Sequence, residues 1–161
     1  MRYLPSSGTP LIGNCRLLRY KRCKHIFLSC GKNVKIEQKA YIASWYNLVI
    51  GDNHGLGINC CIPQNTVIGE NVMMGPNCYI LAQNHDVSRT DIPMIQQGFI
   101  APKQTVIKDD VWIGRDVLMT PGRIIEKGTI IAGGCVLCKD FPAFSIVGGN
   151  PSRLIKSRLY D

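Results

Sequence analysis

His85 is the residue of this sequence whose type and position best suit proton-transfer chemistry. It stands in Asn84-His85-Asp86, directly before a non-repetitive stretch that ends where a regular pattern resumes at Ile107. An imidazole with an ordinary pKa of about 6.5 can both take and return a proton near neutral pH, so His85 is a candidate general base. Asp86 is a candidate to orient the His85 ring, although a side chain adjacent in sequence often points elsewhere.

The scaffold that must position His85 follows a six-residue repeat. Aliphatic side chains recur at Ile50, Leu56, Ile62, Ile68, Met74 and Ile80, and again at Ile107, Ile113, Met119, Ile125, Ile131 and Leu137. The fourth residue after each is mostly small or β-branched, and the next residue is often glycine. This period fits neither a helix nor a simple strand alternation. It is the hexapeptide pattern of a parallel β-helix, in which the aliphatic residue fills the interior of a triangular coil. We therefore predict an all-β fold.

The chain of 161 residues predicts one domain with three parts. Residues 1–30 form an N-terminal arm and cap. Residues 31–142 form the β-helix, with residues 81–106 extruded as a loop. Residues 143–161 form a C-terminal tail, which is expected to be a short helix or a cap. A long loop inside a compact repeat domain is usually functional, which draws attention to the segment that starts beside His85.

The net charge of +8 is compatible with nucleic acid, an anionic membrane surface or a phosphate-bearing ligand. Nucleic acid is disfavoured because the basic residues gather at the two ends of the chain without an aromatic platform. A short basic helix is expected within residues 13–29, and it has two interpretations. It is a cap over the open end of the β-helix, or a peripheral contact with an anionic membrane or a lipid-linked substrate. The two can coexist.

The eight cysteines do not predict a disulfide framework. Cys60, Cys78 and Cys135 fall in the small inward position of the repeat and are expected to behave as compact core residues. This favours a reduced, cytoplasmic protein. The sequence also shows no secretory apolar segment and no apolar run long enough for a transmembrane helix.

Two polar residues occupy repeat positions where small residues are expected. His54 is expected to be a turn-lining, hydrogen-bonded histidine rather than a substrate contact. A buried, unpaired guanidinium at Arg123 would be costly, so this side chain must reach solvent, a neighbour or an acidic group.

Three motifs together resemble one branch of the hexapeptide-repeat acyltransferases. They are Asn84-His85-Asp86 before the loop, Asp110-Val111-Trp112-Ile113-Gly114 on re-entry into the repeat, and Gly148-Gly149-Asn150-Pro151-Ser152-Arg153 at its exit. The branch includes galactoside, maltose and nodulation-factor O-acetyltransferases. In appearance the chain is most similar to colanic-acid and capsule acetyltransferases, over residues 31–158.

This resemblance implies a left-handed β-helix and a homotrimer with active sites between neighbouring subunits. It implies acetyl-CoA as the acyl donor and no metal. The implied acceptor is a hydroxyl of a saccharide, with a surface-polysaccharide precursor expected. His85 would take the hydroxyl proton and return it to the leaving thiolate, and fixed donors would stabilise the tetrahedral oxyanion.

The resemblance also implies roles for particular residues. The catalytic residues would be His85, Asp86 and, by a looser match, Asn59. The residues that would bind acetyl-CoA are Trp112, Gly114, Arg115, Gly133, Cys138, Lys139, Arg153 and Lys156. Trp112 would lie near the acyl-pantetheine arm. The backbone near Gly114 and Arg115 would help to hold the oxyanion. The side chains of Lys139, Arg153 and Lys156 would bind the phosphates of coenzyme A. Cys138 departs from the family, which usually has Thr or Ser there.

Several other functions stay open at this stage. They are a xenobiotic (antibiotic) O-acetyltransferase, a sugar-nucleotide N-acetyltransferase and a non-catalytic β-helix module. A γ-type carbonic anhydrase is disfavoured because His25, His54 and His85 are too dispersed to hold zinc. A serine acetyltransferase would need a longer helical N-terminal domain.

Overall fold

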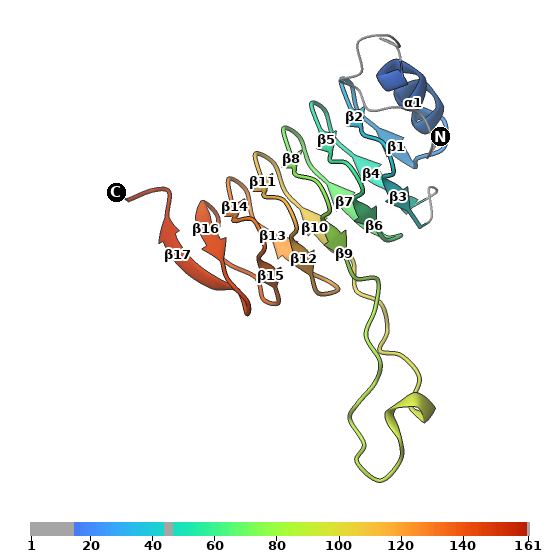
Figure 1. The fold of residues 1–161 in the computed structure, drawn as a ribbon, viewed down its shortest axis with the longest axis vertical. Coiled ribbons are helices and arrows are strands. Elements are labelled where there is room, and N and C mark those ends of the chain that lie inside the picture. Colours follow the sequence, from blue (N-terminus) through green and yellow to red (C-terminus); the bar gives the residue numbers. More distant parts are fainter. Residues whose placement is uncertain (1–14, 44–46, 161) are drawn as a thin grey trace.

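The chain folds into a three-sided parallel β-helix from which one long arm projects (Figure 1). The computed structural model describes residues 15–43 and 47–160. Sheet A contains β1 (Ser29–Cys30), β4 (Val49–Ile50), β7 (Thr66–Ile68), β10 (Thr105–Ile107) and β13 (Ile124–Ile125). Sheet B contains β2 (Lys35–Ile36), β5 (Gly55–Leu56), β8 (Met73–Met74), β11 (Trp112–Ile113), β14 (Ile130–Ile131), β16 (Ser145–Gly148) and β17 (Arg153–Ser157). Sheet C contains β3 (Tyr41–Ile42), β6 (Cys61–Ile62), β9 (Tyr79–Ile80), β12 (Leu118–Met119) and β15 (Val136–Leu137). The prediction of an all-β fold, built as a β-helix of stacked coils, is confirmed. The predicted irregular arm over residues 1–14 lies outside the described residues.

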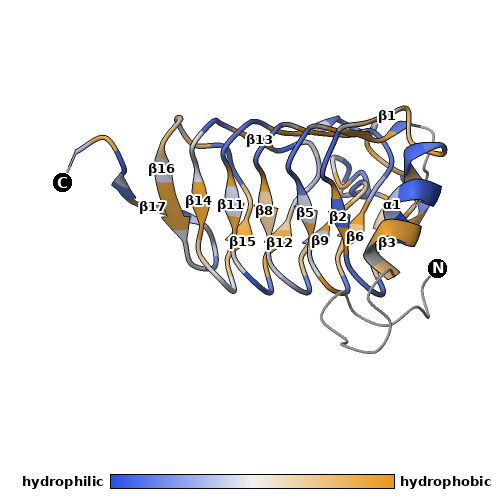
Figure 2. Cartoon of the chain, turned by 90° about the horizontal axis from the view of Figure 1, so that it is seen from above, coloured by the Kyte–Doolittle hydropathy of each residue, from blue (hydrophilic) through white to orange (hydrophobic). Residues whose placement is uncertain are grey.

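The hexad residues form the core, as predicted. All twelve aliphatic side chains of the two series are buried, with exposures between 0% and 6%. Burying each such side chain contributes about 1.5–3 kcal/mol. Cys60, Cys78 and Cys135 are also fully buried, which confirms that they fill interior positions. The rungs of the solenoid, with this shared core, are stacked in a row in Figure 2.

Register is set by stacking one coil on the next. Val49 pairs with Val67 and Ile50 with Ile68, so three hexads separate successive strands of a sheet. The extruded segment does not disturb this pattern, because Ile107 still pairs with Ile68. The insertion therefore leaves the solenoid at one corner and returns to the next rung without a gap.

Asparagines hold the corners of the coils. Asn33, Asn53 and Asn71 have φ values of 56°, 54° and 57°, a left-handed conformation that asparagine tolerates better than most residues. Their side chains form a ladder: Asn33 Nδ2 donates to Asn53 Oδ1 at 3.1 Å, and Asn53 Nδ2 donates to Asn71 Oδ1 at 3.1 Å. Side-chain amides thus link adjacent coils where the backbone turns.

Helix α1 (Cys15–Lys24) covers the N-terminal end of the solenoid. Its Cys15, Arg19 and Cys23 face inward and are buried. Arg19 Nε donates to Ile36 O at 2.6 Å, and the guanidinium lies 3.8 Å from Glu37. The predicted basic helix is therefore present, and its inner face closes the first coil. None of the helices among the described residues is long and apolar enough to cross a membrane.

The C-terminal tail contains strands, so the expectation of a helix there is wrong. β16 extends sheet B parallel to β14, and β17 turns back antiparallel to β16. A free edge of β16 would leave backbone groups unpaired, and β17 supplies their partners. The solenoid consequently runs from β1 at Ser29 to β16 at Gly148, beyond the predicted limits of 31 and 142.

The two unusual polar residues behave differently. Arg123 Nη1 donates to Cys138 O at 3.1 Å and lies 3.3 Å from Asp140, so it reaches the acidic group that its position demanded. His54 is 1% exposed, and neither ring nitrogen has a hydrogen-bond partner of normal geometry among the described residues, although the Val72 backbone interacts with the ring. Burial lowers the pKa of His54 to about 4.

Candidate functional site

His85 lies on the arm that projects from the solenoid, defined here as residues 82–104 (Figure 1). The outgoing and returning segments of the arm, called its legs here, pair with each other. Asp86 N–H donates to Gly98 O at 3.1 Å, and Ile100 N–H donates to Asn84 O at 3.0 Å. Beyond them the chain turns through the short 3₁₀-helix η2 (Met94–Gln96). His85 therefore sits near the base of the arm, opposite Phe99, rather than within a coil.

The environment of His85 suits a general base. Its Nδ1 lies 3.2 Å from Gly98 O, and its ring centroid is 4.3 Å from that of Phe99 at an interplanar angle of 30°. A carbonyl only accepts hydrogen bonds, so this contact favours the tautomer with the proton on Nδ1. Nε2 then carries the lone pair that a base needs, and the side chain is exposed.

Asp86 is not the group that faces Nδ1 of His85. Its Oδ1 accepts a hydrogen bond from Ser88 N–H at 2.9 Å, which lowers the pKa of the Asp86 carboxyl. The turn formed in this way stabilises the start of the arm. In this structure the His85 ring is oriented by Gly98 O and Phe99, while a catalytic role of Asp86 stays a prediction.

The predicted oxyanion donors lie at the corner between sheets B and C. Gly75, Gly114 and Gly133 stack there so closely that a Cβ on Gly114 would lie 2.5 Å from Gly133 N. Gly114 N–H donates to Ile131 O at 2.8 Å, so it is already part of the backbone hydrogen bonding between β11 and β14. The Arg115 N–H makes no hydrogen bond within residues 15–43 and 47–160, so it is the better candidate donor of the two.

Asn59 belongs to the same corner. Its φ is 58°, and its Nδ2 donates to Asn77 Oδ1 at 3.2 Å. Asn77 Nδ2 in turn donates to Asp116 Oδ1 at 2.8 Å, and Arg115 Nε pairs with the other Asp116 oxygen at 2.8 Å. This chain of contacts gives Asn59 a structural role at the turn, and its predicted catalytic role stays a prediction.

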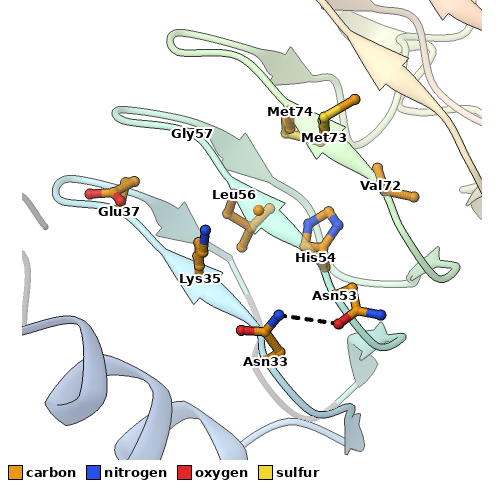
Figure 3. Close-up of a pocket in the computed structure, with 11 residues that line it drawn as sticks. Asn33, Lys35, Glu37, Asn53, His54, Leu56, Gly57, Val72, Met73 and Met74 are labelled. Carbon is orange, nitrogen blue, oxygen red and sulfur yellow. Dashed lines mark hydrogen bonds between the residues drawn. The ribbon is translucent and has the colours of Figure 1, made fainter.

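Trp112 lies on the outer face of sheet B. It is 51% exposed and pairs with Met73 on one side and Ile130 on the other. Two strands away, a groove of about 300 Å³ opens over Gly55, which pairs with Lys35 on one side and Met73 on the other. Figure 3 shows Lys35 and Met73 among the residues that line this groove. A Cβ on Gly55 would meet no atom within 4 Å, so the missing side chain leaves this face open.

The predicted phosphate contacts gather at the C-terminal end of the solenoid. Cys138 N–H donates to Ser152 Oγ at 3.1 Å, and Cys138 Sγ lies 3.3 Å from the same oxygen, which lowers the pKa of the thiol. Arg153 opens β17 opposite Gly148, and Lys156 pairs with Ile146. Lys139 lies 5.4 Å from the centroid of the Phe141 ring. Arg153, Lys156 and Lys139 are all exposed, as a phosphate-binding rim requires.

The site residues thus fall into two groups within one chain. The arm that carries His85 leaves after β9 in sheet C and returns at β10 in sheet A, whereas Trp112, Arg115 and Gly133 lie on sheet B or on its corner with sheet C. No hydrogen bond, ion pair or ring contact joins the two groups within the described residues. One copy of the chain brings the candidate acyl-CoA surface together but leaves the base elsewhere.

No family model matches the chain. A galactoside O-acetyltransferase of Escherichia coli (strain K12) is 29% identical over 137 residues, which cover 83% of this chain and 65% of that protein. A chloramphenicol acetyltransferase of Agrobacterium fabrum is 38% identical over 64 residues, which cover 40% of this chain and 31% of that protein. The chain therefore spans less than two thirds of the length of these curated relatives.

Solved structures match over nearly the whole chain. A maltose O-acetyltransferase from Clostridium difficile 630 superposes with a TM-score of 0.73 and 27% identity, covering 94% of this chain and 90% of that one. A hexapeptide-repeat acetyltransferase from Vibrio cholerae, complexed with acetyl coenzyme A, superposes with a TM-score of 0.69 and 25% identity, covering 90% and 78%. The chain belongs to the hexapeptide-repeat acetyltransferase family.

The chain has the left-handed β-helix expected of this family. Sequence reasoning missed three residues of its candidate site: Gly98 and Phe99, which contact His85, and Ser152, which contacts Cys138. The exit motif contained Ser152 and could have suggested it. Nothing in the sequence paired Gly98 and Phe99 with His85, because that contact depends on how the arm folds back.

Proposed function

We propose that this hexapeptide-repeat acetyltransferase transfers the acetyl group of acetyl-CoA to a hydroxyl of a saccharide, with a surface-polysaccharide precursor as the acceptor. The observation that carries this proposal is the geometry of His85. Its Nδ1 faces Gly98 O at 3.2 Å while the side chain is exposed on a projecting arm. A sugar hydroxyl is a poor nucleophile at neutral pH, and a fixed imidazole lone pair is what its activation needs.

The reaction follows from these positions. His85 Nε2 takes the proton of the hydroxyl as its oxygen attacks the thioester carbonyl. The oxyanion of the tetrahedral intermediate accepts a hydrogen bond from Arg115 N–H. The intermediate then collapses, the carbon–sulfur bond breaks, and His85 returns the proton to the departing thiolate of coenzyme A.

Acetyl-CoA as donor is supported by chemistry on this chain and by the related structure. The solved Vibrio cholerae acetyltransferase is a complex with acetyl coenzyme A. Here Trp112 offers an exposed apolar surface beside the glycine corner, and Lys139, Arg153 and Lys156 offer cations to the phosphates. Gly133 lies beside Arg115, where backbone groups can meet pantetheine amides.

We further propose a homotrimer in which the arm of one subunit completes the site of its neighbour. The support is that His85 and the sheet B surface do not meet within one chain. The Gly55 groove lies on the same outer face as Trp112, and we assign the acceptor to it: Lys35, Glu37 and Asn53 provide polar contacts along its wall (Figure 3). The eight free cysteines fit a cytoplasmic enzyme.

Coenzyme A release measured with a thiol reagent tests the function directly. The purified protein and acetyl-CoA are incubated with mono- and oligosaccharides, nucleotide sugars and hydroxylated antibiotics in parallel. We expect release that depends on a saccharide hydroxyl. Release only with antibiotics would instead favour a xenobiotic acetyltransferase, the alternative that the match to chloramphenicol acetyltransferase supports. Release only with an amino sugar nucleotide would favour N-acetylation.

A further inference from the structure

The net positive charge of this protein comes from its first 36 residues. Residues 1–36 contain eight of the 19 lysines and arginines and none of the 11 acidic residues. The basic residues are Arg2, Arg16, Arg19, Lys21, Arg22, Lys24, Lys32 and Lys35. The rest of the chain holds 11 basic and 11 acidic residues, so it is neutral. The whole net charge of +8 therefore arises from the N-terminal end.

The outer face of α1 combines this charge with apolar side chains. Leu17, Lys21 and Lys24 lie on one face of the helix, since they are three and four residues apart. This face is opposite the one that buries Cys15, Arg19 and Cys23. Leu17 is 51% exposed, and the neighbouring Leu18 is 49% exposed. Lys21 and Lys24 are exposed as well. We call this surface, together with the exposed side chains of residues 25–28, the basic cap.

The segment after α1 adds to the basic cap. Leu28 is 68% exposed and Ile26 is 38% exposed, next to the exposed His25. The chain buries Phe27 between them, so the exposed residues are not a misplaced core. Exposed leucines among lysines and arginines, with no acidic residue nearby in sequence, are the composition of interfacial segments that bind anionic lipid.

We propose that the basic cap docks on an anionic membrane surface. The solenoid would then stand with its N-terminal coil at the lipid and its arm farther along the axis. The two parts of α1 have separate tasks in this arrangement. Cys15, Arg19 and Cys23 close the first coil, and Leu17, Leu18, Lys21 and Lys24 contact headgroups and the upper acyl region. The proposal does not rest on the transferase activity, because no residue of the basic cap belongs to the candidate site.

Co-sedimentation of the full chain with lipid vesicles tests this docking. Vesicles of phosphatidylcholine alone are compared with vesicles of equal parts phosphatidylcholine and phosphatidylglycerol. We expect binding to the anionic vesicles only, and weaker binding when salt is raised from about 0.1 M to about 0.5 M, because screening shortens the range of the attraction. Equal binding to both vesicle types, or none to either, would overturn the proposal.

Matched variants separate the basic cap from total charge. Lys21→Glu with Lys24→Glu should weaken vesicle binding at least about 20-fold, since each basic residue near the surface contributes roughly 5-fold. Lys103→Glu with Lys127→Glu changes the net charge equally, at one position on the arm and one on the solenoid away from the basic cap, and should have little effect. A similar loss for both pairs would show that only overall charge matters, against a docked cap.

The apolar contribution is tested with Leu17→Gln and Leu18→Gln, with thermal unfolding as a control for folding. We expect weaker binding to anionic vesicles while the unfolding temperature is retained. A heparin or single-stranded RNA competitor identifies other occupants. If RNA binds tightly, and binding to it is lost in the Lys21→Glu, Lys24→Glu variant while vesicles are not bound, the cap is a nucleic-acid surface and the proposal fails.

Discussion

The solenoid and the arm of this protein are built by opposite means. In the solenoid, every coil repeats the same hexads, and stacking buries side chains such as Ile68 and Ile113 completely. In the arm, Ile95 is 83% exposed, and the chain is held by a few hydrogen bonds between its legs. The candidate base lies in the region with little core. A rigid scaffold with a projecting loop can carry an exposed reactive group without disturbing the packing that stabilises the fold.

Replacing His85 with Ala is expected to have the largest effect on activity. Loss of a general base should lower kcat by about 10²- to 10⁴-fold while the Kd for acetyl-CoA changes by less than about 3-fold. Steady-state kinetics and equilibrium binding measure the two quantities. Val87→Ala, at the next exposed apolar position of the arm, is the control. Near-normal turnover in the His85 variant would remove this residue from the base role.

The stability of the two regions should differ sharply. Ile68→Ala leaves a cavity in the core and should lower the free energy of unfolding by about 2–5 kcal/mol. Ile95→Ala removes the same atoms from the arm and should change it by less than about 0.5 kcal/mol. Urea unfolding of both variants provides the measurement. Equal losses would mean that the arm packs against something that one chain does not show.

His54 gives the solenoid a pH dependence that can be removed. Its folded pKa of about 4 lies below the ordinary value of 6.5. The unfolded chain therefore binds an extra proton as the pH falls through about 6.5, and stability declines until about pH 4, by up to about 3 kcal/mol. His54→Val matches Val34 and Val72, which occupy the same position in adjacent coils and are buried. We expect this variant to lose less stability between pH 7 and pH 4, and an unchanged slope in unfolding experiments would contradict the assignment.

The phosphate rim should show a smaller, selective effect. Arg153→Ala with Lys156→Ala should weaken binding of coenzyme A about 10-fold and of 3′-dephospho-CoA less, because a cation at the 3′-phosphate has no partner in the second ligand. Isothermal titration with both ligands gives the comparison. The same loss for each would show that these residues do not contact the 3′-phosphate.

Phe99 should contribute least, as a positioning residue. Phe99→Leu removes the ring that lies against His85 and should lower kcat a few-fold, on the order of 3- to 10-fold, with an unchanged KM for acetyl-CoA. Phe99→Tyr keeps the stack and should restore kcat. A change confined to KM, or no recovery with Tyr, would indicate that Phe99 does not orient the imidazole.

Most of the solenoid could be predicted because its information is local and repeated. Each hexad supplies an interior aliphatic residue and a turn. Ile107 therefore predicts where the chain returns to the solenoid, independently of how the arm folds. The tail was less predictable. Residues 153–157 have no strong pattern of their own, and they form β17 because the edge of β16 needs hydrogen-bond partners.

The sequence by itself determined the periodic core, the basic N-terminal end and the choice of His85. Tertiary structure decided which groups surround those residues. Gly98 O meets His85 Nδ1 only because the arm folds back on itself, and Asp86, the neighbour in sequence, turns instead to Ser88. Likewise Arg115 follows Gly114 in the chain, but only stacking on Ile131 shows that the Gly114 N–H is already used. Period and composition fix which side chains are buried, whereas hydrogen-bond partners depend on distances that the chain sets only once it is folded.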